Sequence, residues 1–270
     1  LIIPTALSQI LSVNLLNQEV IKITGLIIIF LAILGSLLFF IYFEEDNQFH
    51  SKFISLKEIK IYLKQNKKIL PFALITFLNL LANNFTANLF IIFVSTYLGL
   101  ASYAGPLLIL YFLITLISTP VWYFFGKIFS SMFLLQTGII ITIVGFFFVI
   151  FTNESNWHLY LLVVLITGFG VGIDLIVPQT ELAEILDQNT ENRLSQIFTA
   201  LFSMVRKAAI GLAGGIALTG YGYLESNDIV IYQGFSNIMV FYFIVPLTIK
   251  VIVLILVMRY RINFHVSARE

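Results

Sequence analysis

The longest run without a charged residue extends from Ile69 to Gly126, and few folds can accommodate such a run. A helix needs about 20 apolar residues to cross the hydrocarbon core of a membrane, so this run is long enough for two spans. Gly99, Gly105 and Pro106 are turn residues that divide it. Charged residues make up 11% of the chain and apolar residues 59%, against about 25% charged residues in a soluble domain. The sequence therefore predicts an all-α integral membrane protein.

Other charge-poor segments of membrane length lie on both sides of this run. We expect seven spans, preceded by the end of an earlier helix. The spans cover residues 23–43, two within 69–126, then 128–153, 157–178, 194–224 and 234–258, and residues 1–16 form the end of the earlier helix. Since the chain begins with Leu1, and its first residues already resemble a membrane helix, we expect it to be a fragment or to lack its annotated start.

Loop charges predict the orientation, because cytoplasmic loops carry an excess of Lys and Arg. Residues 44–68 hold six lysines, which places this segment in the cytoplasm. Alternation puts Lys127, Arg193 and the basic C-terminal tail on the same side, while the opposite loops hold acids such as Glu154 and Asp228. We expect a multi-pass protein of the plasma or inner cell membrane with a cytoplasmic C-terminus.

The basic segment also suggests how the chain is divided. Around Ser55–Lys64, apolar residues recur at helical spacing between lysines, which is typical of an amphipathic helix on the inner membrane face. A basic linker before six helices is the midpoint of a transporter built from two six-helix halves. The predicted parts are residues 1–43 (end of an N-terminal half), 44–68 (cytoplasmic linker), 69–260 (C-terminal six-helix half) and 261–270 (cytoplasmic tail).

Polar residues at membrane depth usually face a cavity or a partner helix. Thr76, Asn79, Asn83 and Thr86 are three or four residues apart and therefore share one helix face. This face could form a cavity wall for a polar solute, or it could make hydrogen bonds to a neighbouring helix.

Three charged residues lie inside predicted spans. Asp174 follows a glycine-rich stretch and could couple transport to a cation or proton, or form an ion pair that fixes helix packing. Lys207 lies near the middle of its span and could contact substrate or take part in coupling, or could simply pair with a carboxylate. Lys250 is nearer the predicted inner end of its span, and we expect it to extend towards the membrane surface.

An acidic cytoplasmic segment connects two of the spans. Glu184, Asp187 and Glu191 precede Arg193 there. The segment could be an ordinary solvated loop, or a gating loop whose ion pairs form in one access state and break in the other.

Several kinds of function find no support in the sequence. There are no cysteines, and the three histidines show no ligand spacing, so we predict no metal site. No nucleophile–base pair or phosphate-binding loop is visible, so we predict neither a catalytic site nor a bound organic cofactor. The net charge of +1 gives no reason to expect a nucleic-acid partner.

Longer motifs carry a resemblance to a known family. One is Ala183-Glu184-Ile185-Leu186-Asp187 with Glu191-Asn192-Arg193, followed fourteen residues after the arginine by Lys207, then by a Gly211–Gly215 run and Gly220-Tyr221. Another is Pro120-Val121-Trp122 with Gly126-Lys127. These stretches resemble the glycoside–pentoside–hexuronide:cation symporters, the melibiose-permease branch of the major facilitator superfamily. Asn192 replaces the glycine usual before the arginine, and the acidic loop is two or three residues shorter than in that family.

The resemblance implies a twelve-helix alternating-access symporter, of which this chain covers the end of helix five to helix twelve. Its partners would be a small polar solute such as a sugar or glycoside, a coupling cation (Na⁺ or H⁺), the lipid bilayer and the missing N-terminal half. A lipid or lysolipid carrier of the same superfamily and a non-transporting remnant of a split gene are the alternatives.

One helix shows a pattern typical of close packing. Ala209, Ala213 and Ala217 recur every four residues, as do Gly211 and Gly215. Such rows let helix backbones approach closely, so we expect both rows to contact a neighbouring helix.

Overall fold

The computed structural model describes residues 26, 29–30, 33–38, 55–187, 192–231 and 236–266, and all regular elements in this part of the chain are helical. Six helical segments are long and apolar enough to cross a membrane: Ile69–Tyr97, Ala101–Gly126, Ser131–Phe151, His158–Leu186, Leu194–Ser226 and Asn237–Phe264. Six of the seven predicted spans are therefore confirmed. The predicted span at 23–43 and the helix end at 1–16 lie mostly or wholly outside the described residues.

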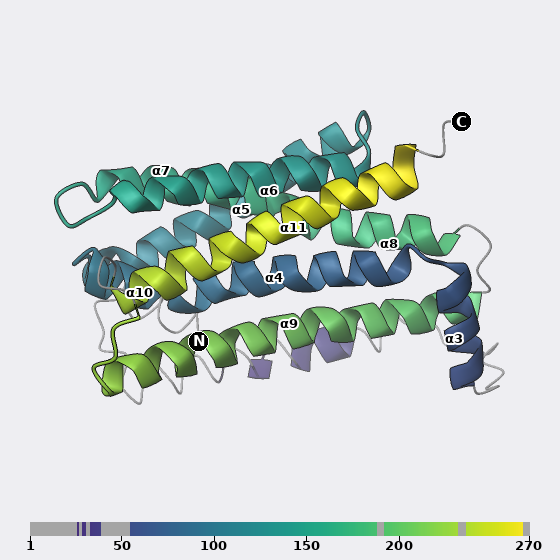
Figure 1. Cartoon of the computed structure of the whole chain (residues 1–270), viewed down its shortest axis with the longest axis horizontal. Coiled ribbons are helices and arrows are strands. Elements are labelled where there is room, and N and C mark those ends of the chain that lie inside the picture. Colours follow the sequence, from purple (N-terminus) through teal and green to yellow (C-terminus); the bar gives the residue numbers. More distant parts are fainter. Residues whose placement is uncertain are drawn as a thin grey trace.

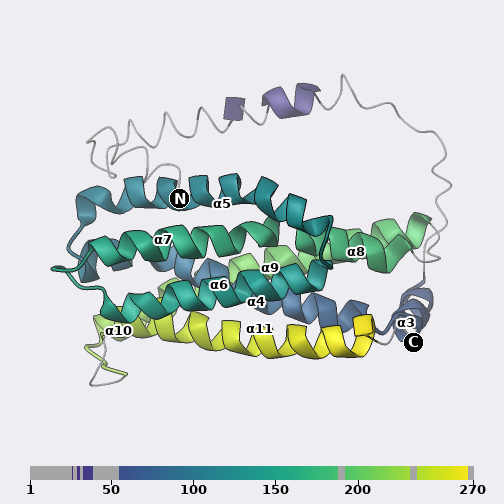
Figure 2. The ribbon, with the colours of Figure 1, turned by 90° about the horizontal axis from the view of Figure 1, so that it is seen from above.

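The helices run alongside one another as a bundle (Figure 1). Its elements are α3 (Leu56–Gln65), α4 (Ile69–Ile92), α5 (Ala104–Gly126), α6 (Ser131–Phe147), α7 (His158–Val171), α8 (Val177–Asp187), α9 (Asn192–Ser226), α10 (Asn237–Met239) and α11 (Val245–Arg261). Short 3₁₀ segments and π turns extend or join these helices. The 3₁₀ segments are Ala101–Tyr103, Phe148–Phe151 and Gly172–Leu175, the last of which is η4. The π turns are Phe93–Tyr97, Val240–Ile244 and Ile262–Val266. Helix α4 packs against α9 and α11, and α7 packs against α5 and α6. Helices α5 and α11 lie at opposite margins of the bundle in Figure 2.

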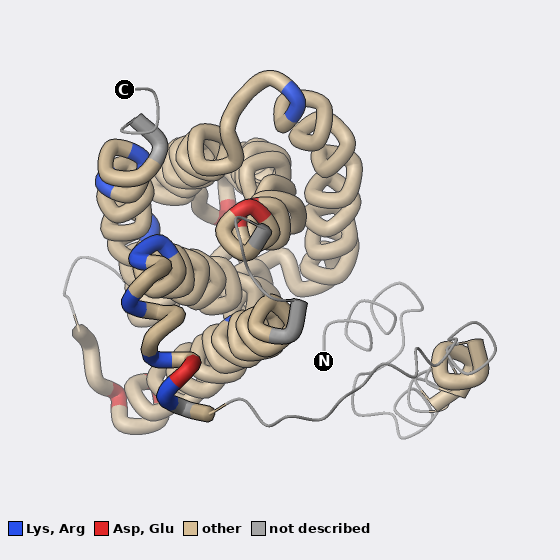
Figure 3. Tube along the Cα trace, turned by 90° about the vertical axis from the view of Figure 1, so that its right-hand side faces the viewer, with Lys and Arg blue, Asp and Glu red and all other residues tan. Residues whose placement is uncertain are grey.

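Helix α3 is the amphipathic helix predicted in the basic segment. Its first turn is fixed by a capping box, in which the Ser55 hydroxyl accepts from the Glu58 N–H (3.2 Å) and the Glu58 carboxylate accepts from the Ser55 N–H (3.3 Å). Tyr62 is buried and its ring packs against Phe198 of α9, at 4.8 Å between ring centroids. Lysines gather around α3 at the end of the bundle viewed in Figure 3, which is the end predicted to be cytoplasmic.

The buried side chains form two apolar clusters, one towards each end of the bundle. One contains Phe85, Phe93 and Tyr242, and the other contains Phe72 and Tyr260. Along α4, the polar face with Thr76, Asn79 and Asn83 lies between the residues that belong to the two clusters. The bundle therefore has a polar layer between two apolar ones.

Glycines bring three helices into close contact beside this layer. A Cβ atom added at Gly172 would overlap the Ser118 side chain of α5, and one added at Gly170 would overlap the Thr142 side chain of α6. Since only glycine fits at these contacts, the backbones of α5, α6 and the α7–η4 segment approach closely.

The small residues of α9 divide into two faces, so the prediction for them is only half right. Ala209, Ala213 and Ala217 are completely buried, and α9 packs against α4. Gly211 and Gly215, in contrast, have no atom of another element within 4 Å of an added Cβ. Because the two rows lie on different faces of the helix, only the alanine row contacts a neighbour in the described part of the chain.

Candidate functional site

Asp174 lies where the fourth span is interrupted. The α-helical pattern of α7 ends at Val171, a 3₁₀ segment follows over Gly172–Leu175, and α8 begins at Val177. A 3₁₀ stretch inside a long helix often marks a hinge. Asp174 is nevertheless buried, with 5% of its surface exposed, so its carboxylate depends on partners from other helices.

Two asparagines of α4 hold this carboxylate. The Asn79 amide N–H donates to Asp174 Oδ1 at 2.7 Å, and the Asn83 amide N–H donates to Asp174 Oδ2 at 2.6 Å. Hydrogen bonds to an ionised acceptor are shorter and stronger than neutral ones. The polar face of α4 therefore binds the one carboxylate that η4 places in the polar layer.

A lysine of α11 completes the cluster. The Lys250 ammonium donates to Asn79 Oδ1 at 2.6 Å and interacts electrostatically with Asp174. The Asn79 side chain thus bridges an acid and a base, with its N–H groups towards one and its oxygen towards the other. We call Asp174, Asn79, Asn83 and Lys250 the charged cluster.

The position of Lys250 corrects the sequence analysis. We expected this side chain to extend to the membrane surface, yet only 1% of its surface is exposed. The span runs from Asn237 to Phe264 and not to about Met258, which puts Lys250 at its middle. One signal was available, because Lys250 is the single charged residue between 237 and 258.

Two buried polar atoms beside the charged cluster make no hydrogen bond. They are Thr76 Oγ1 and Asn83 Oδ1, and the Thr76 side chain is 2% exposed. Buried polar atoms are nearly always paired, so an unpaired one calls for an explanation. This face of α4 has spare hydrogen-bonding capacity.

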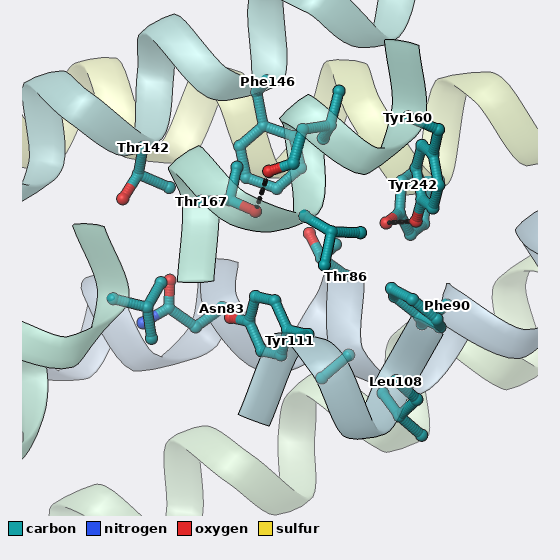
Figure 4. Close-up of a pocket in the computed structure, with 14 residues that line it drawn as sticks. Asn83, Thr86, Phe90, Leu108, Tyr111, Thr142, Phe146, Tyr160, Thr167 and Tyr242 are labelled. Carbon is teal, nitrogen blue, oxygen red and sulfur yellow. Dashed lines mark hydrogen bonds between the residues drawn. The ribbon is translucent and has the colours of Figure 1, made fainter. Parts of the chain in front are cut away.

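A cavity is lined in part by Asn83 of the charged cluster (Figure 4). Besides α4, the helices α5, α6 and α7 and the π turn Val240–Ile244 line it, with hydroxyl groups, aromatic rings and aliphatic side chains. The lining residues are Asn83, Thr86, Ala87, Phe90, Leu108, Tyr111, Thr142, Phe146, Tyr160, Val163, Val164, Thr167, Val171 and Tyr242. In this conformation the cavity has room for only about one or two water molecules, so a sugar could enter only after the helices move apart.

The remaining candidate residues of α4 behave as their spacing predicts. Thr76 and Asn79 are buried, Asn83 and Thr86 are partly buried, and all four belong to the face turned into the bundle. Asn79 and Asn83 make the predicted interhelical hydrogen bonds, and Asn83 and Thr86 line the cavity. The structure thus shows the interhelical hydrogen bonds, and a role of the cavity in holding a polar solute stays a prediction.

Lys207 is not part of the charged cluster. It lies on an exposed face of α9, and no hydrogen bond or ion pair joins it to Asp174. The base that accompanies Asp174 is Lys250 instead. This exposed face is open to lipid or to further protein, and a role of Lys207 in transport stays a prediction.

The predicted gating loop is partly helical, which corrects the sequence analysis. Glu184 belongs to α8, where its carboxylate accepts from the Ser131 hydroxyl at 3.3 Å, and Asp187 is the last residue of α8. The helix continues because Leu182, Ile185 and Leu186 recur at helical spacing and are buried. Arg193 lies in the first turn of α9, and Glu191 lies outside the described residues. The structure leaves the gating role itself a prediction.

In the described ranges no group of three acidic or histidine side chains could hold a metal ion. The chemistry that the charged cluster offers is the reversible separation or neutralisation of two opposite charges in the polar layer.

Comparison with known proteins adds one finding. A family model described as "MFS/sugar transport protein" matches residues 1–264. No curated protein and no solved structure matches the chain. The six spans agree with this match, which covers nearly the whole chain. The chain therefore belongs to the MFS/sugar transport protein family and is a multi-pass membrane transporter, not an enzyme.

Proposed function

We propose that this protein takes part in moving a small polar solute, a sugar or glycoside, across the cell membrane by cation-coupled alternating access. The charged cluster is the observation that carries the proposal. An acid and a base at the middle of a membrane bundle are costly and persist where transport uses them. Here they join three separate spans at a break in one of them.

The cavity supports a sugar as the solute. Amide and hydroxyl groups of Asn83, Thr86, Thr142 and Thr167 can hydrogen-bond sugar hydroxyls, and rings such as Tyr111 offer apolar faces. A few polar groups in an otherwise apolar lining are typical of small-molecule sites. The apolar lining also favours a second candidate, a lysolipid.

In this proposal residues 69–260 form the C-terminal half of the transporter, and residues 1–43 belong to the other half. The two halves rock against each other around a site near the middle of the membrane. The exposed face of α9, with Lys207, meets the other half, and the segment from Glu184 to Arg193 acts as a cytoplasmic latch. The C-terminus is cytoplasmic.

Uptake measurements test the proposal. The gene is expressed with its natural upstream sequence, and membrane vesicles are given labelled sugars, glycosides or lysophospholipids under an imposed proton or Na⁺ gradient. We expect accumulation of a sugar or glycoside, abolished by Asp174→Asn but not by the exposed loop variant Glu154→Gln. Accumulation of lysophospholipid alone would replace the sugar by the second candidate. No gradient-driven uptake of any of these solutes would contradict the proposal.

A further inference from the structure

We propose that one side of α3 binds the anionic headgroups of membrane phospholipids. This side consists of Lys57, Lys60 and Lys64, and we call it the lysine face. Three features of α3 carry the proposal: its direction in the molecule, the contacts of its apolar side and the charges on its opposite side. Such binding is independent of the transport proposed above.

Helix α3 runs along the plane of the membrane. In Figure 1 its axis runs across the direction of the long helices, and in Figure 2 it is seen along its own axis. Because the long helices cross the membrane, a helix that runs across them follows the membrane surface. It lies at the end of the bundle where α4 begins.

The apolar side of α3 is held by the bundle. The Tyr62 ring packs against Phe198 of α9, and Ile59 and Leu63 pack against the same apolar cluster. Phe198 belongs to the candidate span Leu194–Ser226, so α3 lies against the flank of α9 near the level where this span enters the membrane. Since packing occupies the apolar side, α3 can meet lipid only with its other side.

That other side is basic. Lys57, Lys60 and Lys64 are exposed, and on the helix they lie within about 60° of one another and about 140–160° from Tyr62. Within the described residues, no hydrogen bond or ion pair engages their ammonium groups. Glu58, the one acid of α3, lies on a different side, where its carboxylate caps the first turn. The lysine face therefore carries three positive charges and no carboxylate.

A membrane surface matches the shape and the charge of this face. The three lysines extend over about 10 Å of helix, so one free phosphate ion cannot contact them all, whereas neighbouring headgroups can. Anionic lipids at the cytoplasmic surface, where the loop charges predict this segment, attract each nearby lysine by about fivefold in affinity. Ile61 lies among the lysines and is 46% exposed, and it can contact the acyl chains next to the headgroups.

A label on α3 makes the binding measurable. The chain contains no cysteine, so a single introduced cysteine carries a fluorophore at one known position. Gln65 is the last residue of α3 and is exposed beside the lysine face. Phospholipids brominated near the headgroup quench a fluorophore on Gln65→Cys only when they are close to it.

The test uses the full labelled chain in phosphatidylcholine nanodiscs that hold the same small fraction of brominated phosphatidylglycerol or brominated phosphatidylcholine. We expect severalfold stronger quenching by phosphatidylglycerol at low salt and a smaller difference at high salt. The triple variant Lys57→Gln, Lys60→Gln, Lys64→Gln should lose the difference, because its affinity for phosphatidylglycerol falls roughly a hundredfold.

Two controls separate the lysine face from basic charge in general. The triple variant Lys57→Arg, Lys60→Arg, Lys64→Arg keeps the charges and should keep the preference. The pair Lys127→Gln with Arg259→Gln removes two exposed charges outside α3 and should leave the preference unchanged.

Equal quenching by the two lipids at low salt would overturn the proposal and leave the face to water or to a soluble acidic partner. A preference that persists in the triple glutamine variant would also overturn it, as would release of phosphatidylglycerol by inorganic phosphate but not by chloride at the same ionic strength. If the triple glutamine variant does not reconstitute, the three single substitutions replace it. Each should lower the affinity about fivefold, and no change in any of them would be equally decisive against the proposal.

Discussion

At the scale of single residues, Asn79 is the side chain whose position is most constrained, because its one amide group hydrogen-bonds both a buried carboxylate and a buried ammonium. Its N–H groups and its oxygen lie on opposite sides of the side chain, at 2.7 Å from Asp174 and 2.6 Å from Lys250. No apolar residue of similar size can replace either contact. Asn84 provides a comparison, since the hydrogen bond of its N–H is to Leu80 of the same helix.

We predict that Asn79→Leu lowers the free energy of unfolding by about 3 kcal/mol, because it removes the hydrogen bond to Asp174 Oδ1 and the acceptor of the buried Lys250 ammonium. Asn84→Leu should change it by less than about 1 kcal/mol. Thermal unfolding of the two variants in the same detergent measures the difference. Equal stabilities of Asn79→Leu and Asn84→Leu would show that the bridge does not stabilise the bundle.

Lys250 and Lys207 should respond differently to the same substitution. Lys250→Met removes the buried base and leaves Asp174 uncompensated, so we expect lower thermal stability and loss of coupled uptake. Lys207→Met changes an exposed side chain, and we expect unchanged thermal stability. A destabilised Lys207→Met beside a fully stable Lys250→Met would contradict the positions that the structure gives these lysines.

Residue spacing predicted part of this site, and only tertiary structure could supply the rest. The face of α4 with Asn79 and Asn83 follows from helical periodicity, and Asp174 from its charge in an apolar span. The pairing of residues 79 and 174 joins positions 95 apart in the sequence, which no local pattern specifies. The prediction for Lys250 was wrong because it assumed that the last span ends at about residue 258. The span continues to Phe264, which places Lys250 at its middle and not near its inner end.

At the scale of helices, α9 shows why small residues alone do not identify a packing face. Two rows of small residues satisfy the same four-residue period, and the choice between them depends on how the helix is rotated. The structure turns the alanine row towards α4 and leaves Gly211 and Gly215 without a neighbour.

A matched pair of substitutions tests this rotation. We predict that Ala213→Leu destabilises the bundle by roughly 1–3 kcal/mol, because the larger side chain overpacks a completely buried position. Gly215→Leu should be tolerated by the described helices, since an added Cβ meets no atom within 4 Å. Thermal unfolding of both variants gives the comparison. The reverse order of stabilities would mean that the glycine row is the packing face.

The fourth span shows a further limit of reading helices from sequence. The acids after Pro178 suggested that the helix ends there, but buried apolar residues continue its period through α8. Proline is tolerated in this position because Pro178 lies in the first turn of α8, where its missing N–H has no intrahelical partner in any case. The interruption that does occur, η4, lies a few residues earlier and holds Asp174.

At the scale of the whole molecule, the architecture was the most predictable level. The apolar composition and the long charge-free runs require membrane helices, and six predicted spans occur in the structure. Their boundaries differ from the predicted ones by up to several residues. What composition could not provide is the layering, in which a thin polar layer with the charged cluster separates two apolar clusters.

This layering leads to the central claim, that charge neutralisation at Asp174 couples ion movement to solute movement. The most direct measurement is the pH and the Na⁺ activity outside vesicles that contain the transporter expressed with its upstream sequence, both recorded when the transported sugar is added. Wild type and the Glu154→Gln control should take up the coupling cation with the sugar, so that one of the two readings changes. Asp174→Asn should still exchange labelled for unlabelled sugar but change neither reading. A normal sugar-evoked cation uptake in Asp174→Asn would contradict the account.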